Sequence, residues 1–113
     1  MTNESHWSFP LFSEWLKRVG NHLRECGFQV DLQETPDDPS IRMRVEGNLL
    51  LGEIIVEGSS ISVQEVASLE SGDWLFASYG AIPKDQPYDI AIGPFLSYFL
   101  PNQKDNRSES LSS

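Results

Sequence analysis

The spacing of the apolar residues changes once along the chain, and this change restricts the folds that the chain can adopt. Between residues 9 and 26, apolar side chains recur at steps of four and three, which places them on one stripe of a helix. The stripe consists of Phe12, Leu16, Val19, Leu23 and Cys26. Ser8 is well placed to cap this helix and Gly27 to end it. From Phe28 the period becomes two, as on one face of a β-strand, so the chain predicts an amphipathic helix followed by a sheet.

Five segments with strand character follow the helix, and short turns separate them. They either alternate between apolar and polar residues or are almost continuously apolar. The predicted strands are residues 28–33, 41–46, 49–57, 61–67 and 74–79. Gly47 and Asn48 are typical of a tight hairpin turn. Because strands with such short connections pair with their neighbours in sequence, we expect an antiparallel meander sheet of about five strands.

The segment after the last strand combines two patterns. Apolar residues alternate between Tyr88 and Ile92, whereas the apolar residues from Ile92 to Leu100 fit a helix. Pro94 prevents one continuous helix through both parts, so we expect a helix that begins near Gly93. This helix would pack on the sheet beside the first one, and the fold class is α+β with both helices on one face.

The composition is that of one ordinary globular domain. The chain has 113 residues, of which 39% are hydrophobic and 22% charged. We expect the domain to span residues 9–100, between a flexible N-terminus at residues 1–8 and a disordered polar tail at residues 101–113. Apolar runs are too short to cross a bilayer, and the start of the chain does not resemble a secretory signal. With a single cysteine, these features predict a protein of the reducing cytoplasm.

Strand alternation assigns side chains to the two faces of the predicted sheet. The face beneath the helices is expected to bury Phe28, Val30, Ile41, Met43 and Val45. Gly20 would allow the first helix to approach this face closely. The outward face would carry Asp31, Arg42, Arg44, Glu46, Glu53 and Glu57. The last strand adds one of two alternating pairs to the outward face: Trp74 and Phe76, or Leu75 and Tyr79.

The negative charge of the chain is concentrated in its middle. Ten acids and two bases lie between Phe28 and Gly80, so this segment carries −8 of the total net charge of −9. Charge gathered in this way either keeps a protein soluble or forms a surface for a cationic partner. An acidic balance argues against nucleic acids and anionic membranes as partners. Because the outward face combines carboxylates with aromatic residues, we favour a docking surface for a basic protein.

Residues that could carry catalysis or bind a metal are few and scattered. His6 and His22 are not spaced as metal ligands, and Asp37 and Asp38 are typical of a solvated turn. His22 and Cys26 are one helical turn apart, which is more typical of chance neighbours than of a base and its nucleophile. We expect Cys26 to be a buried thiol on the apolar stripe. The chain therefore predicts no enzyme, no cofactor and no metal site.

The order of these features resembles that of a known group of proteins. A Phe-x-x-Trp helix, with Phe12 and Trp15, ends in Gly-Phe before the first strand. A Pro/Asp loop (TPDDPS), a Gly-containing turn (LGEIIVEGSSISVQEV), a Gly-Asp turn (SGDWLF) and the closing segment GPFLSYFL follow. Over residues 9–100 this order is similar to that of the small cytoplasmic immunity proteins encoded beside bacterial polymorphic toxins, most nearly the TriTu immunity family. The resemblance implies that the chain binds one cognate toxin domain and occludes its basic active-site region.

Charge and strand alternation nominate the side chains that would contact such a partner. They are Glu46, Glu53, Glu57, Glu65, Asp73 and Trp74. We expect the unbound protein to be a monomer or a weak dimer. An alternative interpretation is an acidic secretion chaperone for a virulence effector, a class that is typically homodimeric. A regulatory ligand-binding module is a third possibility.

Overall fold

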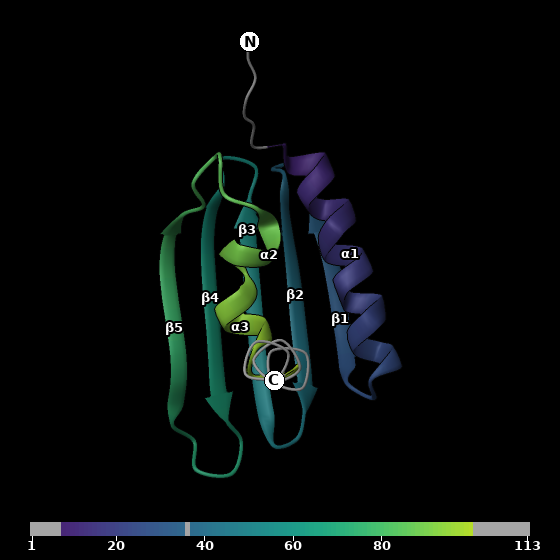
Figure 1. The fold of residues 1–113 in the computed structure, drawn as a ribbon, viewed down its shortest axis with the longest axis vertical. Coiled ribbons are helices and arrows are strands. Elements are labelled where there is room, and N and C mark those ends of the chain that lie inside the picture. The colour runs from purple at the N-terminus through teal and green to yellow at the C-terminus, as the bar shows by residue number, and fades with distance from the viewer. Residues whose placement is uncertain (1–7, 36, 101–113) are drawn as a thin grey trace, which may run out of the picture.

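The chain forms one antiparallel sheet whose helices pack against a single face (Figure 1). The computed structural model describes residues 8–35 and 37–100, so the predictions for residues 1–7 and 101–113 lie outside the described residues. The elements are α1 (Phe9–Glu25), β1 (Gln29–Thr35), β2 (Ser40–Gly47), β3 (Leu50–Glu57), β4 (Ile61–Ser68), β5 (Trp74–Ala81), α2 (Tyr88–Ala91) and α3 (Gly93–Leu96). The sheet order is β1-β2-β3-β4-β5, and each strand is antiparallel to its neighbour. The predicted α+β class and meander are confirmed.

Local capping explains where α1 begins and ends. The Ser8 hydroxyl accepts a hydrogen bond from the Leu11 N–H at 3.4 Å, and the Ser8 backbone is extended, as in an N-cap. At the other end Gly27 has a φ of +99°, which glycine adopts without strain. The Phe28 N–H then donates to the Leu23 carbonyl at 3.1 Å and turns the chain into β1.

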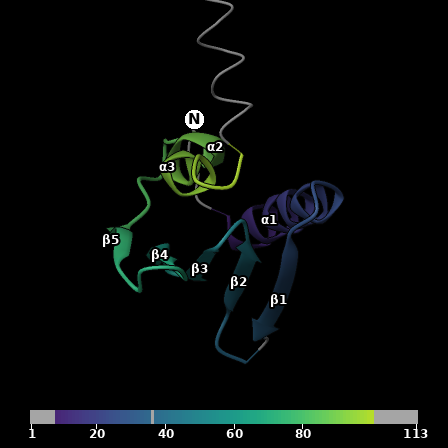
Figure 2. The same cartoon turned by 90° about the horizontal axis from the view of Figure 1, so that it is seen from below.

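The helices all lie on one face of the sheet, which we call the covered face (Figure 2). On this face α1 packs against β1 and β2, and α3 packs against β4. The buried hydrophobic residues between these layers are Phe12, Leu16, Leu23, Phe28, Ile41, Met43, Val45, Ile54, Val56, Val66, Ile82, Ile92, Phe95 and Phe99. The residues that alternation predicts for this face are therefore buried, except that Val30, on the edge strand β1, is half-buried.

Two glycines lie where helical and strand segments approach most closely. A Cβ at Gly20 of α1 would come within 2.9 Å of Leu32 Cδ1, which confirms the close approach predicted for this glycine. A Cβ at Gly52 of β3 would come within 2.7 Å of Phe99 Cζ and 2.8 Å of Phe95 Cζ. Glycine at these positions lets the helical layer sit directly on the sheet.

Cys26 is exposed, so the prediction of a buried thiol is wrong. α1 ends at Glu25, and Cys26 is its C-cap, where the backbone leaves the helical course. A stripe position beyond the last helical residue no longer points to the sheet. The Cys26 sulfur lies 3.9 Å from His22 Nε2 on this exposed end of the helix.

The C-terminal helix is shorter than its apolar pattern predicts. α2 shows that the ambiguous segment is helical rather than extended, and Ile92 separates it from α3. α3 begins at Gly93, as predicted, but it ends at Leu96. Beyond it the Phe99 N–H donates to the Leu96 carbonyl at 3.0 Å, and this turn keeps both Phe95 and Phe99 buried.

An irregularity between β4 and β5 changes the faces to which the side chains of β5 point. Trp74 pairs with Ala67, whereas Phe76 pairs with Val66. Leu75 is therefore an extra residue on β5, as in a β-bulge. Because of this extra residue, Trp74 and Phe76 point to opposite faces of the sheet.

Both of the pairs predicted for the outward face of β5 are therefore wrong. Trp74 shares the outward face with Tyr79, and their exposed fractions are 67% and 79%. Phe76 instead faces the helices, where its ring centre lies 5.9 Å from that of Tyr98. Strict alternation cannot reveal this arrangement, because the bulge changes the period at one residue.

Candidate functional site

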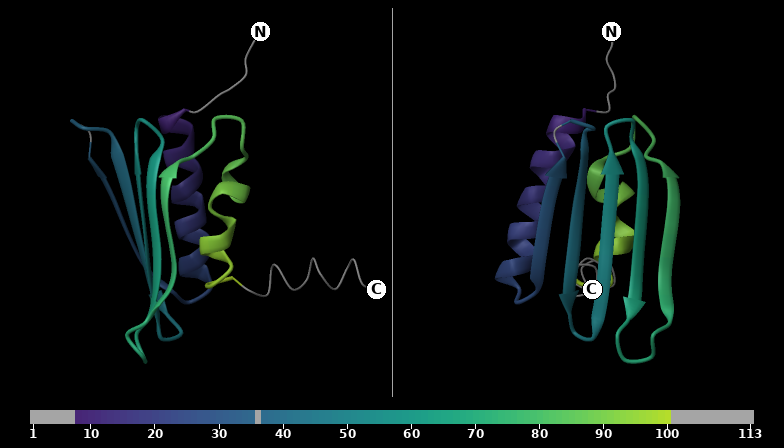
Figure 3. Two further views of the ribbon diagram at one scale, coloured as in Figure 1. Left: turned by 90° about the vertical axis from the view of Figure 1, so that its left-hand side faces the viewer. Right: turned by 180° about the vertical axis from the view of Figure 1, so that it is seen from behind.

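The face of the sheet opposite the helices has no helix over it (Figure 3). Within residues 8–35 and 37–100, α1, α2 and α3 all lie on the other side, which confirms the predicted one-sided packing. We call the uncovered side the open face. Its residues are Gln29, Asp31, Gln33, Thr35, Ser40, Arg42, Arg44, Glu46, Leu51, Glu53, Ile55, Glu57, Ile61, Val63, Glu65, Ala67, Trp74, Ala77, Tyr79 and Ala81.

Cross-strand pairing arranges the open face into rows that run from β1 to β5. The first row is Gln29, Glu46, Leu51, Ala67 and Trp74. The central row is Asp31, Arg44, Glu53, Glu65 and Ala77. The third row is Gln33, Arg42, Ile55, Val63 and Tyr79. Over β3, β4 and β5, two carboxylates of the central row thus lie between two rows of apolar and aromatic side chains.

Glu53 is held by two arginines of the neighbouring strand. One of its carboxylate oxygens lies 3.4 Å from Arg44 Nη2 and 3.6 Å from Arg42 Nε. Arg42 also lies 3.8 Å from the Asp31 carboxylate, and the Glu53 side chain is only 25% exposed. These contacts balance much of the charge of Glu53, so its main role on the open face is to order the two arginines.

Glu65 lies opposite a like charge, and no described cationic side chain forms an ion pair with it. Its cross-strand partners are Glu53 on β3 and Ala77 on β5. Carboxylates that face each other across two strands are destabilising. Among the described residues, the half-buried Glu65 side chain has neither an ion pair nor a hydrogen bond. It is the carboxylate in the central row that a partner's cation could neutralise.

The remaining predicted contact residues divide into two groups. Glu46 and Glu57 are exposed on the open face, with no ion pair in the described part of the chain. Asp73 instead lies in the loop before β5, where its N–H donates to the Ser71 hydroxyl at 3.2 Å and its carbonyl accepts from the Ser68 N–H at 2.8 Å. The structure therefore brings every predicted contact residue except Asp73 onto one face.

Sequence reasoning missed the apolar part of the open face. The almost continuously apolar segment at residues 49–57 forms β3, and its Leu51 and Ile55 lie half-buried on the open face. Val63 continues this apolar surface on β4, and Tyr79 extends it on β5. The apolar run was the available signal, since apolar residues on an uncovered face are a mark of an interaction surface.

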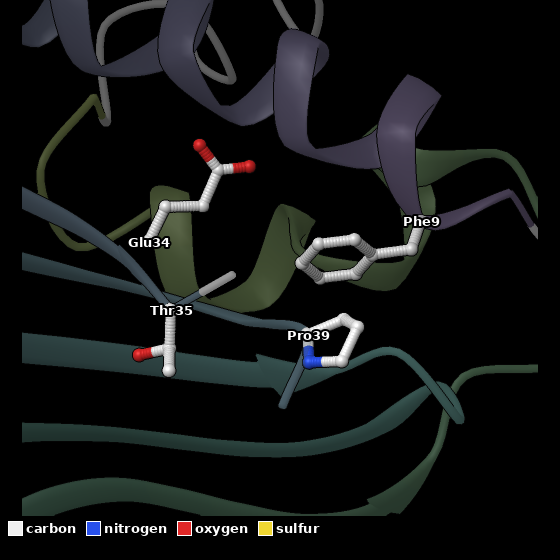
Figure 4. Close-up of a pocket in the computed structure, with 4 residues that line it drawn as sticks. All are labelled: Phe9, Glu34, Thr35 and Pro39. Atoms are coloured by element: carbon white, nitrogen blue, oxygen red, sulfur yellow. The ribbon is translucent and has the colours of Figure 1, made fainter. Parts of the chain in front are cut away.

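A pocket of about 430 Å³ opens between the start of α1 and the β1–β2 connection (Figure 4). It is lined by Phe9, Glu34, Thr35 and Pro39. The Glu34 carboxylate accepts a hydrogen bond from the Ser13 hydroxyl at 2.6 Å and lies 3.0 Å from Lys17 Nζ. The Ser13 hydroxyl, followed by Lys17, holds the pKa of the Glu34 carboxyl below its ordinary value. Among the described lining residues, Glu34 is the one charged group, and it is already partnered, so its role there is to tie α1 to β1.

Neither a metal site nor a membrane-spanning helix is present among the described residues. They contain no group of three or more histidine, cysteine, aspartate or glutamate side chains that could hold a metal ion. None of their helices has the length and apolar character needed to traverse a bilayer.

Comparison with known proteins supports the resemblance drawn from the order of features. The model of a family described as immunity protein TriTu matches residues 11–98, from the first turns of α1 to just beyond α3. Searches of curated proteins and of solved structures found no match.

Proposed function

The chain belongs to the TriTu family of immunity proteins, and we propose that it neutralises its cognate toxin by placing the open face over a basic active-site region. The family supports toxin neutralisation in general, and it favours binding over catalysis. The observation that carries the proposed binding mode is a sheet face that no described helix covers, on which acids lie beside exposed aromatic residues. We expect the protein to act in the cytoplasm.

The acids of the open face would act before contact is made. A surface of one sign attracts a partner of the opposite sign and raises the association rate above the roughly 10⁵–10⁶ M⁻¹s⁻¹ of neutral pairs. Glu46, Glu57 and Glu65 would contribute most, because none of them forms an ion pair within the described residues. Glu53 would contribute less, since Arg42 and Arg44 already balance it.

The aromatic residues would supply contact area once the partner has arrived. Trp74 and Tyr79 stand exposed on either side of the central row, at the β5 side of the open face. Large aromatic side chains in such positions often dominate the binding energy of an interface. Charged residues would therefore govern the association rate, and the two aromatic residues the lifetime of the complex.

A double charge reversal tests the proposed role of the open face. Glu46→Lys/Glu57→Lys removes two exposed acids that have no ion pair in the described structure, so the fold should survive. At low salt we expect association with the toxin domain encoded next to the gene to slow at least about tenfold. The measurement is stopped-flow or surface plasmon resonance at several salt concentrations, because the difference should shrink as salt screens the charges.

A matched control separates the open face from the total charge. Glu25→Lys/Asp85→Lys changes the net charge by the same amount, but at exposed positions outside the open face. It should slow association much less. If the two double variants behave alike, the open face has no special role in capture.

The mass of the unbound protein distinguishes immunity from the chaperone alternative. We expect light scattering to give the mass of one chain, because each copy carries a net charge of −9 and copies repel each other. An obligate dimer that does not inhibit the toxin would favour a secretion chaperone instead.

A further inference from the structure

Beyond the bulge at Leu75, the outer edge of β5 carries neither the charges nor the proline that commonly protect the edge of a sheet. Natural edge strands carry charged residues or proline, or are covered, because their unpaired backbone groups can pair with another chain. β5 reads WLFASYGA, without a charge or a proline, and it is exposed along most of its length. The opposite edge, β1, carries Asp31 and Glu34 and lies beside α1. The two edges of the sheet are therefore built differently.

The hydrogen bonds next to β5 show which of its backbone groups point away from the sheet. The Ile82 N–H donates to the Ser60 carbonyl at 2.9 Å, so Ile82 points its backbone groups toward the β4 side. In an antiparallel pair these directions alternate from residue to residue. The backbone N–H and C=O groups of Ala77, Tyr79 and Ala81 thus point outward, and β5 has no strand beyond it among the described residues.

The side chains beside this edge indicate the charge of a strand that would pair with it. In the central row, Glu65 on β4 is followed by Ala77 on β5, whose small side chain leaves the space above it open. A lysine or arginine on an added strand, in register with Ala77, could extend over it. Neighbouring strands are about 4.8 Å apart, so such a side chain spans roughly two strand spacings to the Glu65 carboxylate. Trp74 and Tyr79 would flank it on the adjoining rows.

We infer that β5 pairs with an extended, basic segment of the toxin, which adds a sixth strand to the sheet and places a cation on Glu65. This inference rests on the proposed function and specifies how the toxin is held. Backbone hydrogen bonds would supply affinity, and the cation opposite Ala77 would supply specificity. A second copy of the chain fits the edge less well, since it brings a further charge of −9.

Amide hydrogen exchange tests the pairing directly. The probe is the toxin domain encoded next to the gene, inactivated by substitution and bound to isotope-labelled protein. The outward amides of Ala77, Tyr79 and Ala81 should exchange rapidly in the unbound protein and slow at least about tenfold in the complex. The amides of β1 are the internal control and should not change. Unchanged exchange along β5 in the complex would overturn the inference, whereas protection already present in an unbound dimer would assign the edge to a second copy.

Two substitutions test the backbone and the charge separately. Ala77→Pro removes one outward N–H without removing a bond to β4, so circular dichroism and the melting temperature should stay close to wild type. We expect it to weaken toxin binding at least about tenfold, because it removes a donor and obstructs an added strand. Glu65→Gln should weaken binding several-fold, whereas Glu46→Gln, on the same face but far from β5, should have a smaller effect.

The outcomes separate this inference from the proposed function. If Ala77→Pro binds the toxin with wild-type affinity while Glu46→Lys/Glu57→Lys associates slowly, the strand pairing is overturned but the proposed function is not. A wild-type protein that does not inhibit the toxin would overturn the proposed function itself. If Ala77→Pro does not fold, the exchange experiment on the unmodified chain decides.

Discussion

Replacing Gly52 by alanine would show how tightly the C-terminal segment is seated on the covered face. The new Cβ would lie 2.7 Å from Phe99 Cζ and 2.8 Å from Phe95 Cζ. Non-bonded carbon atoms prefer about 3.5–4.0 Å, so each ring would have to retreat by roughly 1 Å. The rings are 5.3 Å apart and both are buried, and Phe99 packs edge-on against Phe28 at 5.5 Å. A shift of either ring therefore disturbs its neighbours.

Two opposing effects determine how much Gly52→Ala changes the free energy of unfolding. Alanine in a strand is more stable than glycine by roughly 0.5–1 kcal/mol, because it loses less backbone freedom on folding. Overpacking a filled core typically costs about 1–3 kcal/mol. Because two rings are displaced at once, we expect a net loss of about 1–2 kcal/mol in the free energy of unfolding. In a domain of this size, that loss lowers the melting temperature by roughly 4–15 °C.

Thermal and urea denaturation followed by circular dichroism would measure this effect. Gly93→Ala is the matched control, since a Cβ at Gly93 meets nothing within 4 Å, and its melting temperature should stay the same or rise. The double variant Gly52→Ala/Phe99→Leu should be more stable than the sum of its single changes predicts, because the shorter side chain relieves the clash. A Gly52→Ala protein as stable as wild type would refute the reasoning.

Two further predictions concern stability and titration. Leu49 and Asn48 form the β2–β3 turn with φ values of +62° and +53°, a conformation that strains leucine more than asparagine. Leu49→Gly should therefore raise the free energy of unfolding by about 0.5–1 kcal/mol, as measured by thermal denaturation. Asn48→Gly is the control and should change the free energy of unfolding little. A Leu49→Gly protein that is less stable than wild type would contradict this account. The pKa of Glu34 lies below its ordinary value of 4.5, so the ionised carboxylate stabilises the fold fully at pH values above 4.5. This stabilisation is lost as the pH falls through the lowered pKa. Ser13→Ala should move the pKa of Glu34 upward in an NMR titration and shift this loss to higher pH, and an unchanged pKa would show that Lys17 alone is responsible.

Features with local causes could be predicted from the sequence. The change from helical to strand spacing at Phe28 identified α1 and the start of the sheet, and the cap at Ser8 follows from one residue type in one place. The failure at Cys26 has a local cause as well, because the apolar stripe continues one residue beyond the end of the helix. Periodicity assigns residues to a face only as long as the element lasts.

Features that depend on pairing between strands could not be predicted in this way. Alternation places Arg42, Arg44 and Glu53 on one face, but only the register of β2 and β3 brings both arginines to the same carboxylate. The bulge at Leu75 is another example, since it depends on how β5 meets β4 and decides that Trp74 lies on the open face. The candidate site was therefore predictable as a set of residues but not as an arrangement.

The sheet order has a consequence for how the protein comes into being. Within the described sheet, every strand bonds to the strand that precedes or follows it in the chain. Short loops close at little entropic cost, and chains rich in such near-neighbour pairings fold quickly. Successive hairpins can thus form as the polypeptide leaves the ribosome, before Phe95 and Phe99 are available to pack on them. Rapid folding of this kind suits an immunity protein, which has to be folded before its toxin becomes active.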